Sequence, residues 1–248
     1  MVPRRMDGTD PLGAGGLSAR RGAVSPVFKD RREAGRALSV VLAGRNDLPD
    51  PVVLALPRGG IPVGGEVAKA LGAPLDVLVV RKLGVPDQPE LAMGAVASGG
   101  VRVVHTGVVA DARVSRERFE RVAEDEMREV GRRERLYRGD RTPVGIHDRT
   151  VLLVDDGLAT GSTMLAAVRA VREHGARKVV VAVPVAPEET CSLMREEAEA
   201  VVCLETPEPF GAVGFWYESF PQLTDDDVRE ALARAWEGPA PEGGTEGH

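Results

Sequence analysis

The sequence predicts an α/β fold, a mostly parallel central sheet with helices on both faces. Apolar runs without alternation, such as Val151–Val154, are typical of strands that are buried on both faces of a parallel sheet. Between residues 50 and 205 such runs alternate with segments of helical spacing, as in successive strand–helix units. Ligands on these sheets bind beyond the carboxyl ends of the strands, so the loops at those ends are the candidate site.

Composition narrows the class of protein. The 248 residues suffice for one large domain or two small ones with a buried core. The net charge of −6 gives no overall attraction to nucleic acid, and no apolar run approaches the ~20 residues that cross a bilayer. Cys191 and Cys203 are expected to be free thiols of a reducing compartment. We therefore expect a cytoplasmic protein with no nucleic-acid or membrane partner.

Order is expected over residues 26–237. Residues 1–25 and 238–248 lack a hydrophobic period and are predicted to be disordered tails. Asp30 is expected to cap the first helix, an amphipathic one. Its inward side would carry Ala34, Leu38, Val41 and Leu42.

The first strand–loop–helix unit follows. Val52–Leu56 reads as a buried strand and Pro62 opens a helix that Gly72 ends. Between them lies the tight loop Pro57-Arg58-Gly59-Gly60, which combines glycines with a cation. An ordinary strand-to-helix turn would not need these residues together, so the loop is a candidate anion site.

Leu75–Val80 reads as another buried strand, which ends in Arg81 and Lys82. A solvated basic pair is the alternative to an anion contact there. A Pro-rich loop then leads to a hairpin whose turn is the Gly99-Gly100 pair. Glu90 in that loop is a candidate acid, base or substrate contact, with a surface glutamate as the alternative.

The remaining elements are expected in this order. The charged segment 115–138 reads as a solvated helix with many i,i+4 pairs. Residues 177–185 form a buried strand, which a helix and another strand near residue 203 follow. Five aromatic residues crowd into positions 210–220, and Thr224 caps a last helix that ends at Trp236.

The most informative stretch is Thr150–Arg172. Its buried strand ends in Asp155 and Asp156, a small-residue loop follows, and helical spacing begins at Ser162. A helix N-terminus receives phosphate well, and Thr160 and Thr163 add hydroxyl donors. Carboxylates instead suit sugar hydroxyls or hydrated Mg²⁺. The pattern indicates a ribose 5-phosphate site and not a Walker A loop, which needs a Lys before the Ser.

The segment VLLVDDGLATGST resembles the signature with which type I phosphoribosyltransferases bind 5-phosphoribosyl 1-diphosphate (PRPP), and it is especially similar to the adenine phosphoribosyltransferase version. The resemblance assigns the ribose hydroxyls to Asp155 and Asp156. It assigns the 5′-phosphate to Ala159, Thr160, Gly161, Ser162 and Thr163. The hypoxanthine-guanine enzymes carry a further Asp where this chain has Ala159, which argues against a simple 6-oxopurine enzyme.

The same resemblance gives roles to the other candidates. It implies that pyrophosphate lies near Arg58, Gly59, Gly60, Arg81 and Lys82. Residues 206–223 resemble a hood over the acceptor, with Phe210 and then Trp216 as the rings that stack on it; core packing is the alternative. Arg58, Lys82 and Glu90 are the expected catalytic residues.

The expected function is transfer of phosphoribose from PRPP to a purine-like base or another planar N-heterocycle, with Mg²⁺ held by Asp155 and Asp156 through water. A homodimer is expected from the family. The alternative is a regulatory protein that senses PRPP without turnover, although the retained Arg58, Arg81 and Lys82 weigh against it. A hydrolase with Asp155 as nucleophile fits poorly, because that chemistry usually uses D-x-D spacing.

Overall fold

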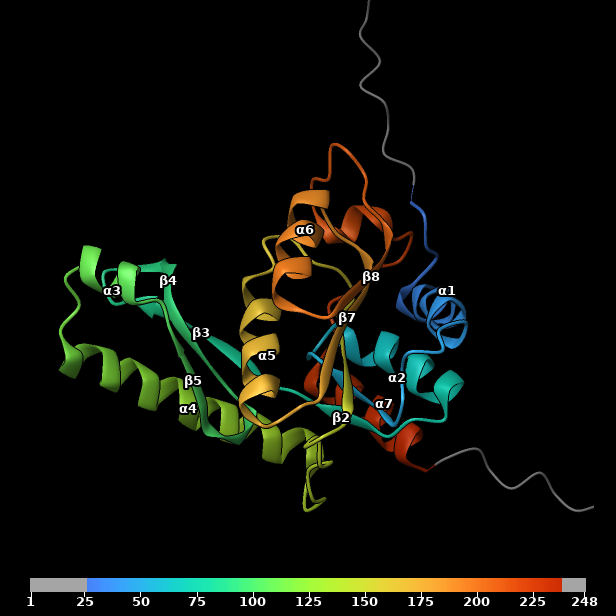
Figure 1. Cartoon of the computed structure of the whole chain (residues 1–248), viewed down its shortest axis with the longest axis horizontal. Coiled ribbons are helices and arrows are strands. Elements are labelled where there is room, and N and C mark those ends of the chain that lie inside the picture. Colours follow the sequence, from blue (N-terminus) through green and yellow to red (C-terminus); the bar gives the residue numbers. More distant parts are fainter. Residues whose placement is uncertain (1–25, 238–248) are drawn as a thin grey trace, which may run out of the picture.

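The computed structural model describes residues 26–237, so the predicted tails at 1–25 and 238–248 lie outside the described residues. Its central sheet has five strands, all parallel, in the order β2–β1–β6–β7–β8 (Figure 1). The strands are β1 Pro51–Ala55, β2 Leu75–Val77, β6 Thr150–Val154, β7 Lys178–Val185 and β8 Ala200–Glu205. The predicted α/β class with a mostly parallel sheet is confirmed.

Helices cover both faces of this sheet, which explains the unbroken apolar strands. In β6, Leu152 and Val154 pack against one set of helices, whereas Val151 and Leu153 pack against another. Successive side chains of a strand point to opposite faces, so every position is buried. The first set is α1 Arg31–Ala43, α2 Gly60–Leu71 and α7 Asp225–Trp236; the second is α5 Ser162–Glu173 and α6 Glu188–Glu197.

The first helix begins where the sequence predicts. Oδ1 of Asp30 accepts a hydrogen bond from the backbone N of Glu33 at 2.8 Å, which caps the helix. Its buried stripe includes Ala34, Leu38 and Leu42. Val41 is 47% exposed, so its predicted inward position is wrong. It lies one position before Leu42, which turns it out of the stripe.

A second, antiparallel sheet has the order β3–β4–β5 and forms an arm, residues 80–138, at the left of Figure 1. The predicted Gly99-Gly100 turn is confirmed between β4 and β5. The arm contains β3 Val80–Val85, β4 Gln88–Ala97, η1 Ser98–Gly100, β5 Val101–Val104, α3 Thr106–Asp111 and α4 Arg116–Arg138.

The prediction of one strand over residues 75–80 is wrong. β2 ends at Val77, and Arg81 and Lys82 lie inside β3, where they pair with Val96 and Ala95 of β4. Leu78 and Val79 are buried between the two strands, so the apolar run continues although the chain changes sheets. An apolar run alone does not mark such a change.

The strand order places the candidate loops side by side. β1 and β6 are neighbours, with Ala55 paired to Val154 at their carboxyl ends, although β1 leads to β2 on one side and β6 to β7 on the other. This reversal is the topological switch point, the usual ligand position on such sheets.

The C-terminal segment packs near this point. It contains η2 Val213–Trp216, and Trp216 and Tyr217 form a small core with Phe28 and Val185. Thr224 caps α7 as predicted, in a reciprocal capping box with Asp227. Over residues 26–237, none of the helices combines the length and apolar character that a membrane span requires.

Candidate active site

Two loops touch at the switch point. Gly59, in the loop after β1, faces the loop after β6 so closely that an added Cβ atom would lie 2.0 Å from Oδ2 of Asp156. A Cβ atom on Gly60 would lie 2.6 Å from the carbonyl oxygen of Val154. These two glycines therefore have a packing reason, because any larger residue would separate the loops.

The carboxylates of Asp155 and Asp156 have different surroundings. Oδ1 of Asp155 accepts a hydrogen bond from the backbone N of Asp156 at 2.8 Å. Burial, and then the neighbouring negative charge of Asp156, raise the pKa of Asp155 well above its usual value. Burial also raises the pKa of Asp156, but a hydrogen bond from Arg31 opposes the increase. Asp156 thus has a cationic partner at hydrogen-bond distance.

Arg31, which no sequence motif marks, is that partner. Its Nε donates to Oδ2 of Asp156 at 2.7 Å, and its Nη1 donates to the carbonyl oxygen of Pro221 at 2.8 Å. Its guanidinium carbon lies 3.7 Å from the ring centroid of Phe220, and the side chain is only 9% exposed. Arg31 therefore joins the start of α1 to the acidic pair and to the C-terminal segment.

Tyr217 makes a second link between that segment and the acidic pair. Its Oη donates to the carbonyl oxygen of Asp156 at 2.5 Å, and burial raises the pKa of its hydroxyl. The ring packs against Phe28 and Phe220, with centroid distances of 5.6 and 4.9 Å. The backbone of Asp156 is thus fixed by an aromatic cluster.

The predicted phosphate loop opens α5. Gly161 precedes the helix with φ +74°, a conformation that favours glycine, and Leu158 and Met164 anchor the loop in the core. The exposed members include Thr160 and Ser162, whose hydroxyl oxygens lie 3.2 Å apart. An exposed helix N-terminus with hydroxyl donors suits a phosphate group. Of the five predicted phosphate-binding residues, Ala159, Thr160, Ser162 and Thr163 are exposed, whereas Gly161 is buried.

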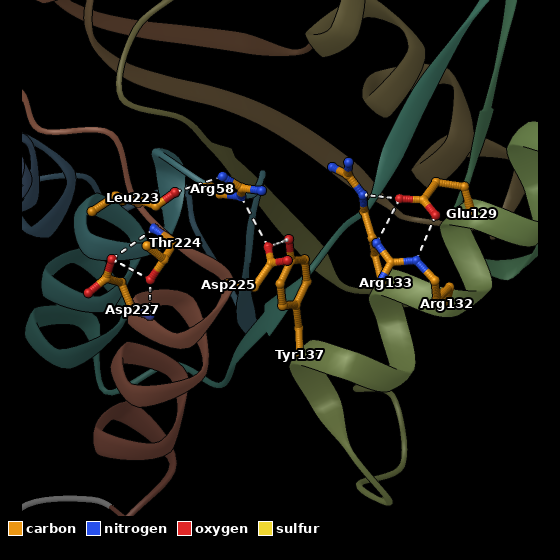
Figure 2. A network of polar contacts seen from close by, with 9 residues as sticks. All are labelled: Arg58, Glu129, Arg132, Arg133, Tyr137, Leu223, Thr224, Asp225 and Asp227. Atoms are coloured by element: carbon orange, nitrogen blue, oxygen red, sulfur yellow. Dashed lines mark hydrogen bonds and ion pairs between the residues drawn. The ribbon is translucent and has the colours of Figure 1, made fainter.

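Arg58 is held by the start of α7 (Figure 2). Its Nε donates to Oδ1 of Asp225 at 3.0 Å, and its Nη1 donates to the carbonyl oxygen of Leu223 at 2.8 Å. Oη of Tyr137 donates to the same Asp225 oxygen at 2.6 Å. The Pro57–Arg58 peptide bond is cis. Arg58 thus lies at the junction of the site with α4 and α7.

A pocket of about 300 Å³ lies between these groups. Two arginines and a glycine from the site line it together with the C-terminal segment. The lining residues are Arg31, Arg58, Gly59, Phe220, Pro221, Gln222 and Leu223. Two guanidinium groups make the pocket suited to a ligand that carries negative charge.

The other predicted residues of the pyrophosphate and catalytic sets lie in the arm. Nε of Arg81 is 2.7 Å from Oε2 of Glu126, and Nζ of Lys82 is 3.4 Å from Oε2 of Glu90. The Glu90 side chain is 99% exposed. No hydrogen bond or ion pair among residues 26–237 connects these arm residues to the loops after β1 and β6. Their assigned roles stay predictions.

The two candidate stacking residues are in contact with each other. The rings of Phe210 and Trp216 stack with centroids 6.4 Å apart, and Nε1 of Trp216 donates to the carbonyl oxygen of Phe210 at 3.0 Å. Trp216 is 8% exposed and belongs to the core around Tyr217. Packing is thus its observed role, while Phe210 is half-buried.

The residues present fit a metal only in one way. Among the described residues, no cluster of three or more His, Cys, Asp or Glu side chains could hold a metal ion. The acidic pair offers two carboxylates, and Arg31 already contacts that of Asp156. This donor set suits a hydrated Mg²⁺ held mainly by oxygens of a bound ligand, with the aspartates reached through water.

A doubly covered parallel sheet with an acidic pair, a small-residue helix start and a glycine loop at its switch point defines the phosphoribosyltransferase class of α/β domains. Comparison with known proteins agrees. The chain belongs to the phosphoribosyl transferase domain family, whose model matches residues 35–218. Arg31 and the pocket residues 220–223 lie outside the matched residues.

Similar proteins support the same placement. Two proteins named "Putative phosphoribosyl transferase", from the CDC 1551 and H37Rv strains of Mycobacterium tuberculosis, are each 47% identical over 209 residues, or 84% of this chain. The chain spans about half, 47%, of the length of these relatives. The crystal structure of TT1426 from Thermus thermophilus is 43% identical, with a TM-score of 0.75 over 84% of this chain and 98% of that one.

Proposed function

We propose that this domain transfers the 5-phosphoribosyl group of PRPP to a nitrogenous acceptor, either a purine-like base or another planar N-heterocycle. The observation that carries the proposal is the contact between the two loops at the switch point. One loop holds an acidic pair and leads into the exposed N-terminus of α5, and the other holds Arg58 and Gly59. A ribose with phosphate groups at both ends matches this distribution of charge.

Each part of PRPP finds a complementary group. The ribose hydroxyls would donate to Asp155 and Asp156, and the 5′-phosphate would accept from the loop 159–163 and from the helix N-terminus. The acidic pair repels phosphate and accepts from hydroxyl groups, so the ribose ring and neither phosphate end would lie against it. The diphosphate would then lie toward Arg58 and Gly59, the glycine lining the pocket beside Asp156.

The chemical step needs positioning and charge. The lone pair of the acceptor nitrogen forms a bond to C1 while the bond from C1 to the diphosphate oxygen breaks with inversion. Pyrophosphate leaves with the electron pair, and the N–H proton of the acceptor passes to water. Positive charge that develops on the ribose would be stabilised by Asp155 and Asp156, and negative charge on pyrophosphate by Arg58 and backbone N–H groups. No covalent nucleophile is required.

Mg²⁺ is part of this proposal. When bound, it would neutralise charge on the diphosphate. Asp155 and Asp156 would reach it through water, as their donor set allows. A homodimer and a cytoplasmic location also belong to the proposal, and gel filtration against the expected monomer mass would test the first.

Calorimetric titration of the 248-residue chain with PRPP, with Mg²⁺ and again with EDTA, tests the function. We expect micromolar binding that weakens when the metal is removed. A panel of purines and other N-heterocycles would then be screened for pyrophosphate release. Binding without release for any acceptor would favour a PRPP sensor, and absence of PRPP binding would overturn the proposal.

A further inference from the structure

Arg31 lines the pocket as an almost fully buried cation. Its Nε and Nη1 donate to Asp156 and Pro221, and its side chain is 9% exposed. Its Nη2 makes no hydrogen bond within residues 26–237 and is not among the buried polar atoms that lack a partner. Guanidinium is a donor at every nitrogen, so this group has donor capacity left for an anion.

The position of Arg31 beside Asp156 points to the diphosphate of PRPP as the anion that it binds. In PRPP the diphosphate is attached to C1, next to the carbon that carries the 2-hydroxyl. A hydroxyl bound by Asp156 therefore places the diphosphate beside the cation that contacts the same carboxylate. The same pocket is also lined by Arg58 and Gly59, which the proposed function assigns to pyrophosphate.

We propose that Arg31 binds the diphosphate of PRPP together with Arg58, and that the 300 Å³ pocket which both line is the diphosphate site. This inference rests on the proposed function. Arg31 comes from the start of α1, far in sequence from the motifs at residues 57–60 and 155–163, and it lies outside the match to the family model. It adds a second arginine to the pocket that Arg58 lines.

Binding of three ligands, each with Mg²⁺, tests the inference: PRPP, ribose 5-phosphate and inorganic pyrophosphate. We expect Arg31→Gln to weaken PRPP and pyrophosphate binding at least about tenfold, because a charge-assisted hydrogen bond is lost. The affinity for ribose 5-phosphate, which has no diphosphate, should change less than about threefold. Arg31→Lys keeps the charge and should recover part of the PRPP affinity.

The matched control is Arg32→Gln. Arg32 is the next residue of α1, is 50% exposed and pairs with Glu66 on the surface, so its replacement should leave all three affinities unchanged. Circular dichroism and thermal unfolding of each variant separate loss of the fold from loss of the site. If Arg31→Gln does not fold, the Lys variant provides the comparison.

Two results would overturn the inference. An equal loss of ribose 5-phosphate and PRPP affinity would mean that Arg31 acts only by positioning Asp156. Unchanged affinities for PRPP and pyrophosphate would mean that the diphosphate lies elsewhere. If the unmodified chain binds pyrophosphate through Arg31 but does not bind PRPP, the diphosphate site stands and the proposed function fails.

Discussion

Nε of Arg58 donates to Oδ1 of Asp225 at 3.0 Å, which ties the loop after β1 to the first turn of α7. The same oxygen accepts a hydrogen bond from Tyr137 of α4 (Figure 2). The cation that we assign to pyrophosphate is thus already paired with a carboxylate. About two turns before Tyr137 in α4, hydrogen bonds from Arg132 and Arg133 hold the pKa of Glu129 at about 2 (Figure 2).

Asp225→Asn should separate binding from stability. The amide keeps an oxygen for Tyr137 but removes a negative charge beside the pocket, so PRPP should bind roughly two- to fivefold more tightly. The folded state should lose about 0.5–1 kcal/mol, since the ion pair is partly exposed. Calorimetric titration and urea unfolding measure the two effects.

Asp226→Asn is the control for that variant. Asp226 neighbours Asp225 but is 79% exposed and pairs with Arg229 within the helix. Its replacement should leave PRPP affinity unchanged. A loss of PRPP affinity in Asp225→Asn would show instead that the carboxylate is needed to orient Arg58.

The Asp225 pair also predicts a pH dependence. The hydrogen bond from Tyr137, and then the charge of Arg58, lower the pKa of Asp225 below its ordinary value of 3.8. Its stabilisation should therefore be complete above about pH 5 and should disappear as the pH falls below about 4, through the folded-state pKa. The unfolding free energies of the unmodified chain and of Asp225→Asn, measured with urea, should differ by a constant amount from about pH 7 to 5. They should converge at lower pH. If the two free energies instead moved apart below about pH 4, the stabilising role of the Asp225 carboxylate would be contradicted.

The two adjacent aspartates should respond differently to the same substitution. Asp155→Asn removes a buried charge that has no hydrogen bond from a cation and keeps the acceptor for the N–H of Asp156, so the unfolding free energy should rise by about 1–2 kcal/mol. Asp156→Asn leaves Arg31 buried without its ion pair and should cost about 1–3 kcal/mol. Both variants should bind PRPP more weakly. Thermal unfolding with parallel PRPP titration checks this, and stability changes of the same sign would refute it.

The contact between the site loops predicts an unequal effect of alanine within α2. At Gly60 the new Cβ would lie 2.6 Å from a backbone oxygen of Val154 and 2.9 Å from Cα of Asp155, so Gly60→Ala should cost about 1–3 kcal/mol and impair PRPP binding. A Cβ atom added to Gly65 of the same helix would have no neighbouring atom within 4 Å. Gly65→Ala should stabilise the protein by about 0.4–1 kcal/mol and leave binding unchanged. Urea unfolding of both variants measures the contrast.

The local sequence pattern is sufficient to predict the parallel sheet and the loops that carry the candidate site. The unbroken apolar strands, the cap at Asp30 and the capping Thr224 follow from short-range preferences that each segment carries by itself. Pattern failed where the outcome depends on distant packing. Arg81 and Lys82 lie inside a strand of the second sheet and not at a strand end, because periodicity does not show where a chain leaves one sheet for another. Val41 is exposed for a different reason, its position on α1 one residue before Leu42.

The order of residues alone establishes the fold class and the chemistry along the chain, an acidic pair and a helix start after one strand and a glycine loop after another. Which charges meet depends on how the elements pack. Arg31 reaches Asp156 across 125 positions, and Arg58 reaches Asp225 across 167. Such pairs leave no local periodicity, because their geometry is set by strand order and helix packing. Residue identity fixes what a side chain can bind, and the fold fixes what it contacts.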